Sequence, residues 1–185
     1  MAKTSDPHAA TVKAWQTRAR NAGSGGAVQQ RKDWKKTWTD RDEGLMQTWI
    51  SGVGSYEKLR RPGNEDGRRM TLALKKLPVH SGASYRGLRH ALRHPEMLTE
   101  GAVFVTKKHS SCSKDKEYAK KFSGVEPDSV LIKIEGRTRD LTKTGVGHRR
   151  GESETVLMAG TRLRVMSVKR SPGSEIPFFV VLREE

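Results

Sequence analysis

The chain has 185 residues, of which 34% are hydrophobic, 6% aromatic and 31% charged, a composition that suits one domain, or one domain with an N-terminal extension. No stretch of it approaches the run of about 20 apolar residues that a membrane-spanning helix needs. Its 36 Lys and Arg residues against 21 Asp and Glu residues give a formal charge of +15, to which both halves of the chain contribute. Such a charge favours anionic cofactors and polyanions as partners. The alternative interpretation is that the charge only keeps a soluble protein dispersed.

The first part of the chain, up to Pro78, is predicted to be helical. A glycine cluster at 21–26 breaks the first helix, and Thr39 or Asp40 can cap the next one. A short helical piece is expected at 56–60, and the last helix must end before Pro78. Apolar residues recur at helical spacing at Leu45, Met46, Trp49 and Ile50, and again at Met70, Leu72, Leu74 and Leu77.

From residue 82 onward, short β-like runs replace the helical pattern. Val130, Ile132 and Ile134 alternate with other residues, as in a strand with one buried face, and one helix, at 114–122, interrupts the strands. The predicted strands are residues 83–86, 102–106, 129–134, 154–158, 161–168 and 178–182. Helices first and strands afterwards predict an α+β fold rather than a βαβ repeat.

Three separate segments carry residues suited to chemistry. The first, Ser-Tyr-Arg-Gly-Leu at 84–88, places Arg86 near the end of a short strand. The second, Ser-Cys-Ser at 111–113, lies where a strand passes into a helix. The third, Glu-Ser-Glu at 152–154, leads into an apolar strand and then into Gly-Thr-Arg-Leu-Arg-Val at 160–165.

Taken in order, these segments resemble the R-S-E class of mono-ADP-ribosyltransferases, the cholera-toxin-like group that includes arginine-modifying bacterial toxins and vertebrate ecto-enzymes. In that class a Tyr-Arg-Gly run precedes a Ser-Thr-Ser run, Ala follows eight residues after the first serine and Phe three residues later, and Glu-x-Glu leads into Gly-Thr-x-x-x-Val. Ser111, Ala119 and Phe122 keep these spacings. The likeness covers about residues 44–183. It implies a catalytic domain at 44–185, with two packed antiparallel or mixed sheets around an NAD⁺ cleft, and a helical extension or linker at 1–43.

The chain departs from the class pattern at three points. Cys112 stands where threonine is usual, and His109 stands where an aromatic residue is common, two residues before the serine motif. The loop at 142–151 contains no aromatic residue, although in arginine-modifying relatives this loop helps to choose the target. The last departure bears on the acceptor more than on the reaction.

The resemblance implies that NAD⁺ is the substrate and that no metal is needed. Nicotinamide leaves the ribose through an oxocarbenium-like state, which we expect Glu154 to stabilise electrostatically. Glu152, on the same strand face about 7 Å away, would orient or deprotonate the nucleophile. Arg86 would hold the diphosphate or ribose, and Ser111 would hydrogen-bond Glu154 and fix its rotamer. The implied NAD⁺-binding set is Arg86, Gly87, Ser111, Ser113 and Glu154.

Other motifs are weaker. Neither Gly23-Ser24-Gly25-Gly26 nor Gly52-Val53-Gly54 keeps the dinucleotide-binding pattern of a Rossmann fold. His90 and His94 lie one helical turn apart without an evident third ligand, so exposed histidines are favoured over a metal pair. Cys112, the only cysteine, permits no internal disulfide and is expected to be a small core-adjacent residue rather than a nucleophile. We expect four tryptophans to pack within the helical lobe, with stacking on nucleic-acid bases as the alternative: Trp15, Trp34, Trp38 and Trp49.

The acceptor stays open between two kinds of macromolecule. In the resembled class, glutamate as the first member of Glu-x-Glu goes with arginine modification, so Glu152 favours a protein arginine. The charge of +15 and the predicted target-recognition loop residues His148, Arg149 and Arg150 favour RNA or a ribonucleoprotein.

The resemblance further implies a toxin or effector from a bacterium or a phage, with an immunity or antitoxin protein as a second partner. The N-terminus is polar and lacks the apolar run of a signal peptide, and a single cysteine fits a reducing compartment. We therefore expect the cytoplasm of the producing or the target cell, reached through a secretion system or a phage. The competing functions are a non-catalytic basic RNA-binding module and an NAD⁺ glycohydrolase.

Overall fold

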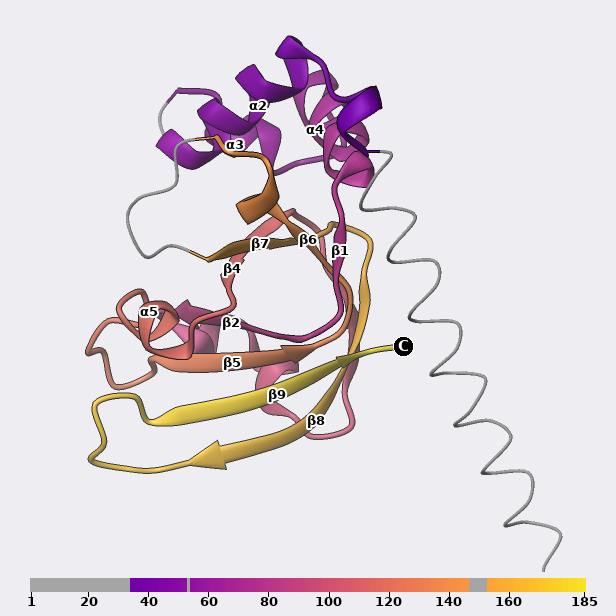
Figure 1. Ribbon diagram of the computed structural model, residues 1–185. Helices are drawn as coiled ribbons and strands as arrows, with labels where there is room; N and C mark the ends of the chain where they lie inside the picture. Colours follow the sequence, from indigo (N-terminus) through magenta and orange to yellow (C-terminus); the bar gives the residue numbers. More distant parts are fainter. Residues whose placement is uncertain (1–33, 53, 147–152) are drawn as a thin grey trace, which may run out of the picture. The chain divides into compact units, whose positions relative to one another are not determined.

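The computed structural model describes residues 34–52, 54–146 and 153–185. The chain divides into two compact units, Met1–Thr37 and Trp38–Glu185, and the architecture below is that of the second unit. In this unit helices come first along the chain and strands follow (Figure 1). The predicted α+β class is confirmed.

The helices of the first part begin and end at local signals. Their bounds are α2 (Asp40–Ser51), α3 (Tyr56–Leu59) and α4 (Glu65–Lys76). Thr39 caps α2 through a reciprocal capping box, in which its side chain accepts from the Asp42 N–H and the Asp42 carboxylate accepts from the Thr39 N–H. Gly52, at φ 66°, ends α2 in the left-handed conformation that favours glycine. Leu77 is already extended, as expected of a residue before Pro78.

All six predicted strands are present, and three more occur among the described residues. The bounds are β1 (Val79–His80), β2 (Ala83–Leu88), β3 (Val103–Val105), β4 (Ser110–Ser113), β5 (Val130–Glu135), β6 (Thr138–Asp140), β7 (Glu154–Leu157), β8 (Arg162–Arg170) and β9 (Phe178–Glu184). The connections also contain the 3₁₀ turns η1 (Ala91–Arg93), η2 (Pro95–Leu98) and η3 (Leu141–Lys143). β1 and β6 pair with each other and are too short for an alternating pattern to reveal them.

The helix expected at 114–122 is shorter than predicted, since α5 covers Lys116–Lys120. Asp115 is the N-cap, because its side chain accepts hydrogen bonds from two backbone N–H groups of the first turn. Lys114 belongs to the preceding turn, where its N–H donates to the carbonyl of Ser153 over 2.9 Å.

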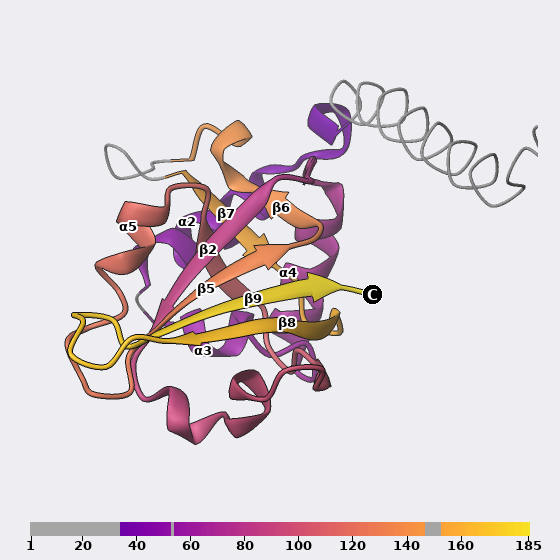
Figure 2. The ribbon, with the colours of Figure 1, turned by 90° about the horizontal axis from the view of Figure 1, so that it is seen from below.

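Hydrogen bonding joins the strands into one nine-stranded sheet in the order β1-β6-β7-β4-β2-β5-β9-β8-β3. β5 and β9 run parallel, and Figure 2 shows them beside β2 and β8. The two packed sheets of the expected fold correspond to two halves of this sheet, β1-β6-β7-β4 and β5-β9-β8-β3, which are continuous through β2. β2 pairs with β4 only at Tyr85 and Ser113, but with β5 from Ala83 to Leu88. This narrow junction lets the two halves diverge and face each other.

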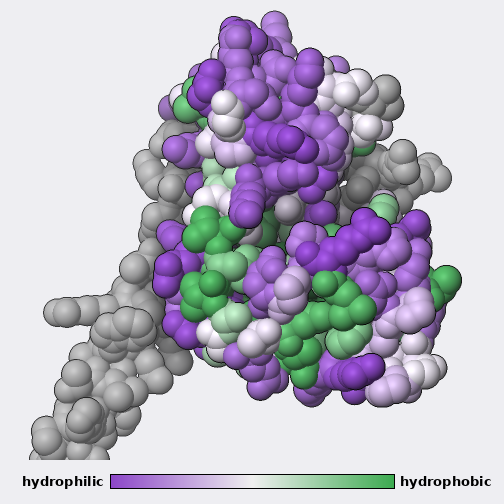
Figure 3. Space-filling model, turned by 180° about the vertical axis from the view of Figure 1, so that it is seen from behind, coloured by the Kyte–Doolittle hydropathy of each residue, from purple (hydrophilic) through white to green (hydrophobic). Residues whose placement is uncertain are grey.

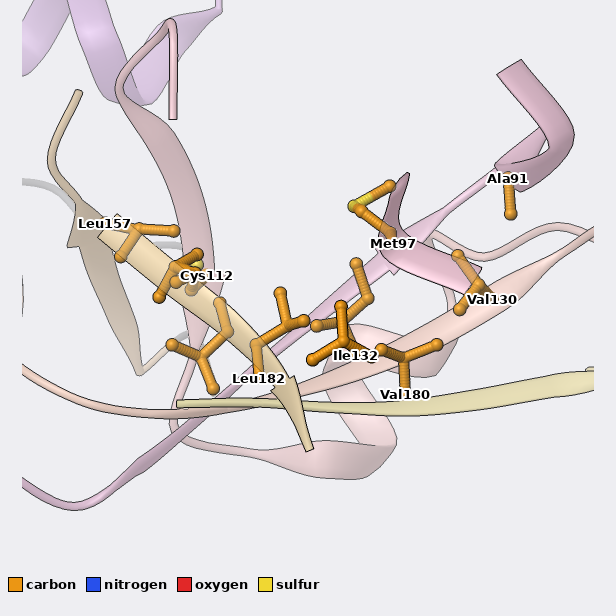
Figure 4. Packing of buried hydrophobic residues seen from close by; sticks show 11 residues of the cluster. Ala91, Met97, Cys112, Val130, Ile132, Leu157, Val180 and Leu182 are labelled. Atoms are coloured by element: carbon orange, nitrogen blue, oxygen red, sulfur yellow. The ribbon is translucent and has the colours of Figure 1, made fainter. Parts of the chain in front are cut away.

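Apolar side chains fill the space between the two halves. Ile132, Val180 and Leu182 come from β5 and β9, and Cys112 and Leu157 come from β4 and β7 (Figure 4). Ile132 is only 2% exposed and Val180 is fully buried. Because these contacts remove apolar surface from water, they hold β4 and β7 over the rest of the sheet.

The outer surface is mixed. On the face seen in Figure 3, hydrophilic residues cover most of the helical end, while apolar patches lie over the strand-bearing part. Large apolar side chains that are exposed among the described residues are Leu72, Leu92, Val105, Phe122, Val125 and Met166. Within the described part of the chain, no helix is both long and apolar enough to cross a membrane.

Candidate active site

Arg86 extends from β2 toward the neighbouring strand β4. Its Nη1 donates a hydrogen bond to the carbonyl oxygen of Ser111. Burial lowers the pKa of the guanidinium from its ordinary value, since water is withdrawn from the charged form. The first two sequence segments therefore meet directly.

Ser111 and Glu154 meet on the adjoining strands β4 and β7. In their antiparallel register Ser111 pairs with Val156 and Ser113 pairs with Glu154, so Ser111 and Glu154 are diagonal neighbours on one face. Ser111 Oγ donates to Glu154 Oε1 over 2.5 Å, and the glutamate is only 4% exposed. The geometry matches the hydrogen bond that the sequence predicted between these two residues.

A third donor to this site comes from the helical lobe, formed by α2, α3 and α4. Trp49 Nε1 donates to the same Glu154 Oε1 over 2.8 Å. Trp49 is 2% exposed, so the predicted packing role is confirmed. The hydrogen bond to Glu154 was missed, because the sequence offers no signal for a contact across 105 residues.

A cleft of about 290 Å³ opens beside these residues. Its lining residues are Tyr56, Tyr85, Arg86, Gly87, Ser111, Cys112, Ser113, Tyr118, Ala119 and Phe122. The structure thus gathers Arg86, Gly87, Ser111 and Ser113 from the predicted NAD⁺-binding set around one cavity, and Glu154, which is not among the lining residues, is hydrogen-bonded to Ser111. The aromatic residues Tyr56, Tyr85 and Tyr118 also line the cleft and were not predicted to do so, although Tyr85 belongs to the Tyr-Arg-Gly motif.

Gly87 lets the helix α5 approach the strand β2. A Cβ atom at this position would lie 2.3 Å from the Ala119 carbonyl oxygen and 2.6 Å from the Ser123 backbone nitrogen. Backbone atoms cannot move aside as a flexible side chain could, so this place in the cleft wall accepts glycine alone. The tyrosine-arginine-glycine run therefore combines a cleft-lining arginine with the packing of α5.

Cys112, the middle residue of the serine motif, lies on the opposite face of β4 from Ser111 and Ser113. Ser111 and Ser113 lie on one face of β4, and Cys112 joins the hydrophobic core on the opposite face. Burial raises the pKa of the Cys112 thiol to about 11, so the thiol stays protonated at neutral pH. This confirms the expected core-adjacent role and disfavours a nucleophilic one. Ser113 Oγ accepts from the Asp115 N–H over 3.0 Å and shapes the turn into α5.

His109 is fully buried and ties the helical lobe to the turn after β7. The Ala159 N–H donates to His109 Nδ1 over 3.0 Å, which leaves the proton of the neutral ring on Nε2. Nε2 lies 2.8 Å from Thr71 Oγ1, and that hydroxyl donates onward to the Gly67 carbonyl over 2.7 Å. Burial lowers the pKa of His109 to about 4, so the ring is neutral in this network.

Tyr56 lines the cleft from α3, and Arg60 is the C-cap of that helix. The Arg60 guanidinium lies 5.6 Å from the centre of the Tyr56 ring, and its Nε donates to the His109 carbonyl over 3.3 Å. Burial raises the pKa of the Tyr56 phenol from its ordinary value, partly offset by the charges of Arg60 and Arg86. The cleft lining therefore combines the Arg86 guanidinium with the neutral Tyr56 phenol, and the Arg60 guanidinium lies against that phenol.

Several predicted residues lie outside the described part of the chain: Glu152 and the target-recognition residues His148, Arg149 and Arg150. The expected pairing of Glu152 with Glu154 on one strand face accordingly remains a prediction.

The histidine pair does not share a ligand position. His90 Nδ1 lies 3.6 Å from Asp128, and His94 Nδ1 lies 3.6 Å from Glu96, so each imidazole faces its own carboxylate. Both side chains are about half exposed, as the sequence predicted. Among the described residues, no three His, Cys, Asp or Glu side chains cluster as metal ligands would.

Solved structures share this architecture. The structure of ADP-ribosyltransferase Vis in complex with an inhibitor matches 88% of the chain and 86% of its own length, with a TM-score of 0.60 and 19% identity. The chain has an ADP-ribosyltransferase fold. Exoenzyme S from Pseudomonas aeruginosa, solved with human 14-3-3 protein beta and Carba-NAD, matches 88% of the chain and 84% of its own length, with a TM-score of 0.60 and 17% identity. The resemblance found in the sequence is thereby confirmed at the level of the fold.

A sequence relative points the same way. The chain is 31% identical over 110 residues to Vis of Vibrio splendidus (strain 12B01), whose name gives its proposed activity as NAD⁺–arginine ADP-ribosyltransferase. The match covers 56% of this chain and 44% of the relative, so the chain spans less than half of that curated protein. No protein-family model matches the chain.

Proposed function

We propose that this protein is a mono-ADP-ribosyltransferase that cleaves NAD⁺ and transfers ADP-ribose to a macromolecular acceptor. The observation that carries the proposal is the connected set Arg86–Ser111–Glu154. Arg86 donates to the Ser111 carbonyl, and the Ser111 hydroxyl donates to the Glu154 carboxylate, beside a cleft of about 290 Å³. These residues come from three strands and are 25 and 43 positions apart in the chain.

The carboxylate of Glu154 is suited to the bond-breaking step. When the bond between ribose C1′ and the nicotinamide nitrogen breaks, the electron pair passes to the nitrogen and neutralises the pyridinium, while positive charge develops on the ribose. A carboxylate already oriented in a site with little water stabilises that charge without reorganising. Glu154 meets this description, since it is 4% exposed and held by two donors.

Arg86 is suited to holding the dinucleotide. It is the charged side chain among the described residues that line the cleft. A guanidinium recognises phosphate oxygens through several N–H groups in a fixed plane. The volume of the cleft is at the lower end for small-molecule sites, so part of NAD⁺ would extend beyond it.

The nucleophile then forms its bond to C1′ and loses a proton. We assign the removal of that proton to Glu152, which is two residues before Glu154 in the sequence. The acceptor that we propose is a protein arginine, because Glu152 keeps the glutamate of the arginine-modifying class and the name of the Vibrio relative includes arginine. A guanidinium must lose a proton to attack, which is the role given to Glu152.

RNA is the competing acceptor, supported by the formal charge of +15 and by His148, Arg149 and Arg150 in the loop before Glu152. We further propose that residues 44–185 contain the catalytic domain and that 1–43 form an extension. A role as a toxin or effector, with an immunity protein in the producer, follows from the same resemblance.

Labelled NAD⁺ tests the proposal. The parent protein should release nicotinamide and label a component of a cell lysate, and Glu154→Gln should lower the rate of release at least about 100-fold, because the amide keeps the shape but not the charge. Glu175→Gln is the matched control, since Glu175 is exposed in the β8–β9 hairpin. Loss of the label to protease identifies a protein acceptor, and loss to RNase identifies RNA.

A non-catalytic RNA-binding module predicts the opposite pattern. It would consume no NAD⁺, and its affinity for RNA would be the same in the parent and in Glu154→Gln. A glycohydrolase would release nicotinamide without labelling any macromolecule. Either result contradicts the transferase function.

A further inference from the structure

Trp49 lies on the buried side of α2, where the helical lobe meets the sheet. It follows Met46 by three residues, and the two side chains are 2% and 0% exposed. Gly52 ends the helix in a left-handed conformation, and the chain then brings Tyr56 back onto the indole, with ring centroids 5.1 Å apart at 57°. The indole of α2 is therefore packed against the Tyr56 ring of α3.

The indole N–H donates to the carboxylate that the proposed function places at the ribose. Trp49 Nε1 lies 2.8 Å from Glu154 Oε1, the oxygen that also accepts from Ser111 Oγ at 2.5 Å. Hydrogen bonds to an ionised group are roughly twice as strong as those between neutral groups. Because the donor residue and the acceptor residue are 2% and 4% exposed, little water competes for this contact.

The two donors differ in what they can determine. The Ser111 hydroxyl rotates about its C–O bond and can follow the carboxylate. The indole N–H is fixed in the ring plane, and the ring is buried and packed against Tyr56, so the direction of the N–H is determined before any ligand binds. Trp49 is not among the residues that line the cleft, and it reaches the site through the hydrogen bond to Glu154 and the ring contact with Tyr56.

We infer that Trp49 is a positioning residue for the ADP-ribosyltransferase reaction: its indole N–H fixes the direction of the Glu154 carboxylate, so the helical lobe as well as the sheet sets the rate of nicotinamide release. The inference rests on the proposed function, because it concerns the step in which the C1′–nitrogen bond breaks. It assigns the lobe a share in the chemistry rather than only in packing.

Trp49→Phe removes the N–H and keeps an aromatic ring against Tyr56. The expected result is a fall in kcat for nicotinamide release of about 10-fold or more, the loss typical of one hydrogen bond to a charged group, with KM for NAD⁺ changed less than about threefold. The acidic limb of the pH–rate profile should move to higher pH, since a donor that favours the ionised carboxylate has been removed. A purely structural role of Trp49 would leave that limb in place.

Trp38→Phe provides the matched control, because it removes an indole N–H from the residue before the N-cap of the same helix. It should keep the parent values of kcat and of the acidic limb. A parent protein that releases no nicotinamide contradicts the proposed function. An active parent together with a folded Trp49→Phe of equal kcat and equal pH profile contradicts only the role of Trp49.

A measurement on the folded parent covers the case in which Trp49→Phe does not fold. In a protein labelled with ¹⁵N-tryptophan, the Trp49 indole proton should resonate downfield and exchange slowly with solvent, as expected for a buried bond to a carboxylate. Glu154→Gln should move this resonance upfield while leaving that of Trp38 in place. An indole resonance unaffected by Glu154→Gln would overturn the inference.

Discussion

In the half of the sheet formed by β5, β9, β8 and β3, the charged side chains of the strands lie at the surface, and the residues that point inward are apolar. The opposite half buries polar groups from β4, β6 and β7 in its interior, namely Ser113, Thr138, Asp140, Glu154 and Thr155. Each of these groups has a partner, as in the chain of buried hydroxyls in which Ser84 lies 3.0 Å from both Thr138 and Thr155. Burial of apolar side chains in the first half stabilises the fold, whereas buried hydrogen bonds in the second half hold polar side chains in fixed directions.

This comparison predicts that the largest loss of stability comes from the apolar half. Ile132→Ala should lower the free energy of unfolding by about 2–5 kcal/mol, because the side chain is only 2% exposed and leaves a cavity. Chemical denaturation measures the change. Lys133→Ala, the next residue on the opposite face of β5, serves as the control and should cost less than about 1 kcal/mol. Equal losses in the two variants would contradict the assignment of β5 to the stabilising half.

In the polar half, we expect a smaller change in the free energy of unfolding when the pH is lowered. The folded-state pKa of His109, about 4, lies below its ordinary value of 6.5, so the neutral ring favours the folded state fully above about pH 6.5. This contribution, about 1–3 kcal/mol, should be lost as the pH falls from 6.5 toward 4, because the unfolded chain binds a proton there and the folded chain does not.

The measurement is the free energy of unfolding between pH 7 and pH 4 for the parent and for His109→Phe. The carboxylates contribute equally to both proteins, so the difference between the two curves isolates the imidazole. A constant difference over this range would show that His109 is not buried in its neutral form.

The smallest effect is expected at the surface. Arg137 and Glu184 form an ion pair of 2.9 Å in which the arginine side chain is 71% exposed. Water and salt screen such a pair, so Arg137→Ala should change the free energy of unfolding by less than about 0.5 kcal/mol. Denaturation at low and at high salt measures this change, and a loss above 1 kcal/mol would remove the distinction between surface and interior polar groups.

Some elements of the structure could be predicted from short stretches of sequence. The candidate capping residues Thr39 and Asp40 predicted the start of α2, where Thr39 is the cap. Pro78 predicted the end of α4, and the alternation of Val130, Ile132 and Ile134 predicted the buried face of β5. These signals act within a few residues, so they can be interpreted without knowledge of the rest of the fold.

Other elements could not be predicted from the sequence. The start of α5 was placed two residues too early, because Lys114 has a helical propensity but its backbone is bonded to Ser153 in the folded chain. β1 pairs with β6, and β6 lies between β1 and β7, so both short strands depend on partners elsewhere in the chain. In these cases a contact distant in sequence decides the local conformation.

For the site, the sequence by itself determined which residue types are available and in what order: an arginine at 86, a serine at 111 and a glutamate at 154. Only the tertiary structure decided that Arg86 donates to the Ser111 carbonyl and that Ser111 and Trp49 both donate to Glu154. The physical reason is that the direction of a buried hydrogen bond depends on how β2, β4, β7 and α2 pack together, and that packing is a property of the whole core rather than of any one segment.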